Sequence, residues 1–299
     1  MQLDKTNNPR LTLLHFNDER GVEVAISAGI PHLNIDVHRF PDNESKVTLP
    51  ILNTDAIAIY LSLDQPNIKL VELMLACATL QKSHHKPIIL IAPYLGYMRQ
   101  DIAFEIGEAV SQKIIGQFLA NYITDIITVD PHLHRTPELI QAIPCQHAIN
   151  LSSANIQADF LSQQFDNAVL VGPDEESEQW VSQVAKLAGL EYLIASKKRC
   201  DDHNVIITLP DANIKNCDVV LIDDIASTGQ TLARCSELIS SRSVKSIHAL
   251  VTHALFDQSA EQLMKKAGIK SIWSTDSIKH STNAISLTPL LADALRAYC

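Results

Sequence analysis

Two adjacent carboxylates, Asp223 and Asp224, stand between an apolar run and a short loop rich in hydroxyl groups. The run Val219–Ile222 predicts a buried strand, and the apolar positions from Leu232 onward predict a helix. The loop that opens this helix consists of Ser227, Thr228, Gly229, Gln230 and Thr231. Such a loop offers backbone N–H groups and hydroxyls to one phosphate at the positive end of the helix dipole, and the carboxylates can accept hydrogen bonds from sugar hydroxyls beside it. The segment therefore predicts a site for a 5-phosphoribosyl group, which has a phosphate at one end and a vicinal diol at the other.

The loop has a single glycine, so it is neither a P-loop nor a dinucleotide-binding fingerprint. We expect this glycine, Gly229, to lie where the backbone approaches the phosphate closely and a side chain would intrude. The alternative is a strand, turn and helix in which the carboxylates and hydroxyls only cap the helix. The complete string, Val-Val-Leu-Ile-Asp-Asp-Ile-Ala-Ser-Thr-Gly-Gln-Thr-Leu, resembles the phosphoribosyl-pyrophosphate loop of the type I phosphoribosyltransferase fold.

Two segments of the first half carry residues suited to a nucleotide. Residues 38–44 bring an aromatic ring, which can stack on a base, together with carboxylates that can accept from an exocyclic amine: Phe40, Asp42 and Glu44. A polar turn before a strand is the alternative there. Residues 92–101 directly follow a predicted strand and end in a group that can hold a polyphosphate and a base or ribose: Arg99, Gln100 and Asp101. A surface turn closed by an ion pair between Arg99 and Asp101 is the alternative.

Two further residues, His132 and Asp174, follow predicted strands in the first and second halves. A histidine and an aspartate at strand ends could share a magnesium ion, mostly through water, whereas a lone histidine after a strand is usually structural. The nearby Glu175, Glu176 and Glu178 fit the acidic first turn of a helix better than a set of metal ligands.

A run of three cations, residues 197–199, follows another predicted strand, and a polar stretch comes next. One interpretation is a solvated basic turn. The other is a flap that brings Lys197 and Arg199 over a transferring phosphoryl group.

Short apolar runs alternate with helical patterns along the chain, which predicts an α/β fold with parallel sheets covered on both faces. The predicted strands are Ile88–Ala92, Ile126–Val129, Ala168–Val171, Tyr192–Ala195, Val219–Ile222 and Ile247–Val251. Amphipathic patterns predict helices over residues 70–80, 110–119 and 180–187, and a last helix over 287–298. Ligands of such folds bind at the carboxyl ends of strands, which is where the candidate residues fall.

The chain has 299 residues, enough for two domains, and 46% of them are hydrophobic. Its net charge of −10 argues against a nucleic acid or a membrane surface as partner. The six cysteines are scattered, with no Cys-x-x-Cys, and the amino terminus is polar without a signal-like apolar run. We therefore expect a cytoplasmic protein with reduced thiols.

Taken in order, the motifs resemble those of the ribose-phosphate pyrophosphokinase family, also called phosphoribosyl pyrophosphate synthetases. They are Arg-Phe-x-Asp-x-Glu, Pro-Tyr-x-x-Tyr-x-Arg-Gln-Asp, Val-Asp-x-His, Pro-Asp, Lys-x-Arg and the Asp-Asp loop. The loop sequence Ser-Thr-Gly-x-Thr is closer to the archaeal-type branch. The resemblance implies two tandem phosphoribosyltransferase-like (type I) domains: residues 1–148 on the ATP side and 149–299 on the ribose 5-phosphate side, with the last helix free to pack on either.

The resemblance also implies an activity: transfer of the diphosphoryl group of ATP to the anomeric hydroxyl of ribose 5-phosphate, with Mg²⁺ as cofactor, in a homodimer or larger homo-oligomer. It assigns Arg99, Gln100 and Asp101 to ATP, with Phe40, Asp42 and Glu44 reaching the adenine from a neighbouring subunit. It assigns His132 and Asp174 to magnesium, and Lys197 and Arg199 to the flap. It assigns ribose 5-phosphate to Asp223, Asp224, Ser227, Thr228, Gly229, Gln230 and Thr231.

The chain departs from the family pattern at three places: Glu175-Glu176-Ser177 after Pro173-Asp174, Met98, and His134-Arg135. Two other functions stay open. One is a nucleotide-salvage phosphoribosyltransferase, which would leave the motifs of the first half unexplained. The other is a catalytically silent relative that binds nucleotides or regulates an active partner.

Overall fold

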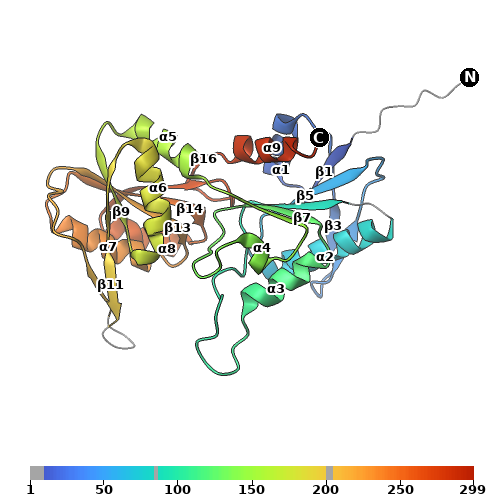
Figure 1. Cartoon of the computed structure of the whole chain (residues 1–299), viewed down its shortest axis with the longest axis horizontal. Helices are drawn as coiled ribbons and strands as arrows, with labels where there is room; N and C mark the ends of the chain where they lie inside the picture. The colour runs from blue at the N-terminus through green and yellow to red at the C-terminus, as the bar shows by residue number, and fades with distance from the viewer. Residues whose placement is uncertain (1–9, 84–86, 200–204) are drawn as a thin grey trace, which may run out of the picture. The chain divides into compact units, whose positions relative to one another are not determined.

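A computed structural model describes residues 10–83, 87–199 and 205–299, apart from the side chains of residues 197–199 and 205–207. The chain forms two compact units, one comprising Met1–Leu151 with Leu287–Cys299 and the other Ser152–Ser286. Each unit is a parallel sheet flanked by helices (Figure 1), so the predicted α/β class is confirmed.

The sheet of the first unit has the strand order β2-β1-β5-β6-β7-β8, and all neighbouring strands are parallel. Its strands are β1 (Leu11–His15), β2 (His32–Asn34), β5 (Ala56–Tyr60), β6 (Ile88–Ala92), β7 (Asp125–Val129) and β8 (His147–Leu151). The central strands are buried along their whole length, as parallel strands covered on both faces are. Because β6 and β7 are neighbours, the segments that follow them leave the sheet side by side.

The helices of this unit are α1 (Glu19–Ala28), α2 (Pro66–Lys82), α3 (Ser111–Ala120), α4 (Leu139–Ala142) and α9 (Thr288–Arg296). The strands β3 (Asp36–Arg39) and β4 (Ser45–Thr48) form an antiparallel hairpin. Leu73 of α2 and Leu119 of α3 share an apolar core with alternate residues of β5 and β6. Helix α9, from the end of the chain, packs beside α1 (Figure 1). Beyond α9, the Tyr298 hydroxyl donates to Asp125 Oδ1 at 3.2 Å, which ties the carboxyl terminus to β7.

The sheet of the second unit has the order β10-β9-β13-β14-β15-β16 and is also parallel. Its strands are β9 (Ala168–Gly172), β10 (Glu191–Ile194), β13 (Asp218–Ala226), β14 (Ser246–Ala254), β15 (Ile269–Thr275) and β16 (Asn283–Ile285). Its helices are α5 (Ala154–Gln164), the 3₁₀ turn η1 (Glu175–Ser177), α6 (Glu178–Ala188), α7 (Gln230–Ser240) and α8 (Gln258–Lys266). An antiparallel hairpin is formed by β11 (Ser196–Arg199) and β12 (Val205–Thr208).

Strand β13 is central and apolar on both faces. Val219 and Leu221 pack in one core with α7 and α8, whereas Val220 and Ile222 pack in another with α5 and α6. This alternation, which any strand imposes on successive side chains, fixes the direction of the residues that continue the strand toward its carboxyl end.

The sequence located six of the strands in the two parallel sheets and missed the other six, which are β1, β2, β5, β8, β15 and β16. The short runs of β1 and β5 contain polar or small residues among the apolar ones. In the part of the chain that the structure describes, no helix is both long and apolar enough to cross a membrane. The cysteines among those residues are free thiols.

Candidate functional site

The adjacent carboxylates Asp223 and Asp224 lie inside β13 (Asp218–Ala226), whereas the sequence predicted a strand that ends at Ile222, directly before them. The pairing of β13 with β14 continues to Ala226, whereas its pairing with β9 ends at Leu221. Hydrogen bonding to β14 therefore extends the strand past its apolar run. The part of β13 that carries the carboxylates reaches beyond its pairing with β9, so it still lies at the ligand-binding edge of the sheet.

The hydroxyl-rich loop follows β13 directly, and α7 begins at Gln230. Gly229 is the N-cap of α7 and has a left-handed backbone conformation, with φ of 68°. A cavity of about 390 Å³ opens between this loop and α8, and its lining residues are Ser227, Thr228, Gln230, Leu255, Asp257, Ser259, Ala260 and Leu263. The structure thus brings three of the predicted phosphate-binding residues to one cavity at a helix N-terminus.

The space where a Gly229 side chain would project is filled by protein. A Cβ atom there would lie 3.0 Å from Met264 Cγ and 3.2 Å from the backbone oxygen of Ala260, both on α8. The predicted reason for this glycine, close approach of a phosphate, is therefore incomplete. The left-handed conformation and the packing of α8 already require glycine in this position.

Asp223 carries a carboxyl group that its surroundings make difficult to ionise. Burial raises the pKa of Asp223 well above its ordinary value, and the charges of Asp224 and Asp174 raise it further. A backbone hydrogen bond from the Asp224 N–H, at 3.0 Å, opposes this shift. The Cys235 thiol on α7 has its pKa raised to about 12. Burial is the main cause, and the charges of Asp174 and Asp223 add to it. This crowding of negative charge on oxygen donors fits a hard divalent cation such as Mg²⁺.

We expect Asp223→Asn to raise the melting temperature in the absence of divalent cations. The pKa of Asp223 is raised on folding. Its contribution to stability is therefore fully present at a pH below 3.8, the ordinary pKa of the group, and is lost as the pH rises through the folded-state pKa. At neutral pH the substitution removes this cost, and a gain of about 1 kcal/mol would raise the melting temperature by about 2–4 °C. Thermal unfolding at pH 5, 7 and 9 with a chelator present measures the effect.

Asp218→Asn, at the other end of β13, is the matched control with the opposite sign. Burial acts to raise the pKa of Asp218, but hydrogen bonds from Lys245 at 2.7 Å and Ser246 at 2.5 Å outweigh it, so that its pKa is lowered. The contribution of Asp218 to stability is present when the pH is above the ordinary pKa of the group and is lost as the pH falls through the lowered folded-state pKa. Asp218→Asn should therefore lower stability at neutral pH. Destabilisation by both variants would contradict the electrostatic account of Asp223.

Asp174 lies just past the end of β9 and caps the 3₁₀ turn η1. Its Oδ1 accepts from the Ser177 N–H at 3.2 Å, and Ser177 Oγ donates to its backbone oxygen at 2.6 Å. Glu175 and Glu176 are exposed in η1, and Glu178 begins α6, so these residues form the acidic first turn that the sequence predicted. The charge of Asp174 contributes to the raised pKa of Asp223.

Lys197 and Arg199 are two positions apart on β11, opposite Ile207 and Val205 of β12. Their backbone therefore belongs to a hairpin and not to an irregular turn. Their side chains lie outside the described part of the structure, as do residues 200–204 between the two strands. Their roles as flap cations stay a prediction.

In the first unit, the segment after β6 is fixed by its polar side chains. Asp101 is buried, and its Oδ1 and Oδ2 accept from Arg135 Nη1 at 2.9 and 3.3 Å. Gln100 Oε1 accepts from Ser111 Oγ at 2.6 Å, whereas Arg99 is exposed. The structure thus pairs the buried Asp101 with the exposed Arg135 and leaves Arg99 facing solvent.

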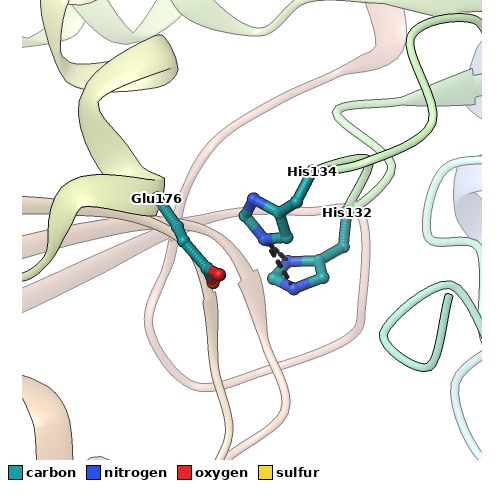
Figure 2. A group of neighbouring side chains, drawn as sticks. All are labelled: His132, His134 and Glu176. Atoms are coloured by element: carbon teal, nitrogen blue, oxygen red, sulfur yellow. Dashed lines mark hydrogen bonds between the residues drawn. The ribbon is translucent and has the colours of Figure 1, made fainter. Parts of the chain in front are cut away.

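The segment after β7 carries two histidines in contact. Figure 2 shows His134 Nε2 facing both ring nitrogens of His132, at 3.1 Å from Nδ1 and 2.7 Å from Nε2. Both rings are half-buried and cross at 86°. Arg135, the next residue, ties this segment to Asp101. The pair between Arg135 and Asp101 therefore joins the segments that follow two neighbouring strands.

Phe40, Asp42 and Glu44 lie at the tip of the β3–β4 hairpin. Phe40 is 42% exposed and contacts the ring of His38 edge to face. Asp42 Oδ1 accepts from the Glu44 N–H at 3.2 Å, and the Phe40 N–H donates to the Glu44 backbone oxygen at 2.9 Å. These contacts lie within the hairpin, and Phe40, Asp42 and Glu44 are exposed at its tip.

Two family models match successive parts of the chain. The N-terminal domain of ribose phosphate pyrophosphokinase matches residues 11–122, and the phosphoribosyl transferase domain matches residues 146–289. Ribose-phosphate pyrophosphokinase 2 of Archaeoglobus fulgidus is 30% identical over 270 residues, which cover 90% of this chain and 94% of that protein. The chain belongs to the ribose-phosphate pyrophosphokinase family. The predicted resemblance is confirmed.

Other members of the ribose-phosphate pyrophosphokinase family support the same grouping. The enzyme of that name from Thermococcus kodakarensis is 28% identical over 277 residues, covering 93% of this chain and 95% of that protein. A crystal structure of phosphoribosylpyrophosphate synthetase from Mycobacterium smegmatis matches the fold with a TM-score of 0.83 at 20% identity, covering 96% of this chain and 98% of the other.

Sequence reasoning missed two residues of the segment that follows β7. His134 and Arg135 were noted only as departures from the family pattern, yet one contacts His132 and the other pairs with Asp101. The available signal was positional, because both residues follow a strand next to β6 in a parallel sheet, where side chains of neighbouring segments meet.

Proposed function

We propose that this protein is a ribose-phosphate diphosphokinase. It would transfer the β,γ-diphosphoryl group of ATP to the anomeric hydroxyl of ribose 5-phosphate, giving phosphoribosyl pyrophosphate and AMP. The observation that carries the proposal is the end of β13, where Asp223 and Asp224 lead into a helix-opening loop that borders a cavity. Family membership over nearly the whole chain supports it.

In this proposal the protein binds and orients both substrates. The 5-phosphate lies against Ser227–Thr231, and the ribose hydroxyls donate to Asp223 and Asp224. Arg99 and Gln100 contact ATP, and Asp101 holds their segment through Arg135. The reaction forms a bond between Pβ and the anomeric oxygen, whose hydroxyl proton is released, and breaks the bond from Pβ to the oxygen bridging to Pα, which leaves with AMP. Alignment and charge neutralisation provide most of the catalysis in such transfers.

Mg²⁺ is the proposed cofactor. Asp174, close enough to influence the ionisation of Asp223, is its proposed carboxylate ligand, and His132 is the proposed ligand in the first unit. A bound Mg²⁺ would neutralise phosphate charge, which the net charge of −10 of the chain otherwise opposes. We propose a cytoplasmic location for the enzyme.

The deciding experiment incubates purified protein with ATP, Mg²⁺ and ribose 5-phosphate and measures AMP. AMP that appears only when ribose 5-phosphate is present supports the proposal. Consumption of phosphoribosyl pyrophosphate with a free base, without formation of AMP, would identify a phosphoribosyltransferase instead. Nucleotide binding without either reaction would identify a silent relative.

We also propose that the adenine site is complete only in a homodimer or larger assembly, because the exposed hairpin tip reaches the nucleotide of a neighbouring subunit. Phe40→Ala and Arg99→Ala should each be inactive and should rescue each other when mixed. If dimers form at random, half are mixed and each mixed dimer has one intact site, so about a quarter of wild-type activity returns. No recovery, despite demonstrated exchange of subunits, would mean that each chain builds its own adenine site.

A further inference from the structure

A buried carboxylate on α2 holds the hairpin that bears Phe40, Asp42 and Glu44. Glu72 is 4% exposed. Its Oε1 accepts from Arg39 Nε at 3.2 Å and Nη2 at 3.1 Å, and from Ser45 Oγ at 2.9 Å. Arg39 ends β3 and Ser45 begins β4, so one oxygen atom joins both strands of the hairpin to the helix.

The register of the hairpin shows which part Glu72 controls. Arg39 pairs with Ser45 next to the turn, whereas Val37 pairs with Val47 farther from it. Val37 and Val47 pack against the apolar core of the first unit. Because residues two apart share a face of a strand, the inner face of the hairpin has an apolar anchor at its base and a polar anchor, Glu72, at its tip.

The polar anchor matters because an isolated two-stranded hairpin is only marginally stable in water. Hydrogen bonds from a guanidinium to a carboxylate are about twice as strong as neutral ones. A buried carboxylate also needs its partners to offset the cost of leaving water. The hairpin tip and Glu72 therefore stabilise each other, and loss of Glu72 should free residues 40–45 while the base stays packed.

We propose that Glu72 is a positioning residue that fixes the hairpin tip and thereby sets the preference of the site for adenine over guanine nucleotides. This inference rests on the proposed function. The carboxylates at the tip can accept from the exocyclic amine of adenine, whereas the corresponding position of guanine is a carbonyl oxygen that they repel. Stacking on Phe40 does not distinguish the two bases. Selectivity thus depends on where the tip holds its carboxylates.

Three variants test the proposal. Glu72→Met keeps the volume and the helix but has no acceptor, and it should raise KM for ATP about tenfold with kcat at saturating ATP changed by less than about twofold. The ratio of kcat/KM for ATP to that for GTP should fall about tenfold. Glu72→Gln keeps an acceptor oxygen and should lie within about threefold of the wild type. The control Lys69→Met, on the same helix as Glu72, removes an ion pair to Asp64, which precedes the helix. It should leave KM and selectivity unchanged.

Hydrogen exchange without nucleotide gives a second measurement that is independent of catalysis. The amides of residues 40 and 42–45 should exchange faster in Glu72→Met than in the wild type or Lys69→Met, while those of α2 should not change. If the wild type makes no AMP, the proposed function fails, and this comparison still decides whether Glu72 anchors the tip.

Equal exchange in all variants, or an active Glu72→Met with wild-type KM and selectivity, would overturn the proposal. Should Glu72→Met fail to fold, Ser45→Ala removes one donor and leaves the pair with Arg39. We then expect KM for ATP to rise about two- to threefold, with faster hydrogen exchange at the tip. Wild-type KM and wild-type exchange in Ser45→Ala would overturn the proposal.

Discussion

Replacing either Lys197 or Arg199 with alanine is expected to lower kcat about 10²-fold or more, with smaller changes in the affinity for ribose 5-phosphate. Both lie on β11, one strand of the β11–β12 hairpin. In the proposed reaction negative charge spreads over the transferring diphosphoryl group, and a cation that meets it mainly in the transition state acts on kcat. Steady-state kinetics with each substrate varied in turn, together with calorimetric titration of ribose 5-phosphate, separates the two effects.

Lys198→Ala is the matched control for this pair, because it removes the same charge from the position between them. A general electrostatic effect of the hairpin would lower kcat by a similar factor in all three variants. A specific role predicts a large loss for Lys197→Ala and Arg199→Ala and a small one for Lys198→Ala. Wild-type turnover in both Lys197→Ala and Arg199→Ala would mean that residues 197–199 form a solvated basic strand without a catalytic role.

Gly229→Val is expected both to abolish ribose 5-phosphate binding and to lower the melting temperature markedly. At φ of 68° a non-glycine residue costs about 1–2 kcal/mol, and a branched side chain costs more. A Cβ atom would also press on α8 at Met264 Cγ and the Ala260 backbone oxygen. Close approach of a phosphate is the only reason for this glycine that the sequence indicates, whereas the structure adds the packing of α8 against it, so we expect the fold to be affected as well.

Thr228→Ala separates binding from folding at the same loop. Thr228 is exposed and lines the cavity, so loss of its hydroxyl should weaken ribose 5-phosphate binding about tenfold without a change in melting temperature. Calorimetric titration and thermal unfolding of both variants distinguish the two roles. An unchanged melting temperature in Gly229→Val would contradict the packing argument, and unchanged affinity in Thr228→Ala would contradict the role of the loop.

The sequence predicted the α/β class and the position of six strands of the two parallel sheets, because these buried parallel strands are short apolar runs with clear ends. It placed the end of β13 too early, since a run that turns to Asp223 and Asp224 gives no sign that β14 continues to pair with it. It missed β1 and β5 because polar and small residues interrupt their apolar character.

For the candidate site, the sequence identified residue types but not their partners. Asp101 was expected to meet ATP directly, whereas Arg135, 34 positions along the chain, occupies its carboxylate. The contact between Arg39 and Glu72 spans 33 positions. Such pairs depend on which strands are neighbours and on how a helix lies against a hairpin, and neither is encoded in local spacing.

The packing of α9 on α1 makes the last residues of the chain part of the unit that begins it. Leu291, Ala292 and Leu295 of α9 are buried, and the second unit is inserted between Leu151 and Leu287. During synthesis on a ribosome, the inserted unit emerges as one continuous stretch and can fold first. The first unit stays open until α9 has been synthesised. A transcript truncated after Ser286 would therefore yield a complete second unit attached to a first unit with an uncovered apolar face, which is a substrate for proteolysis and aggregation.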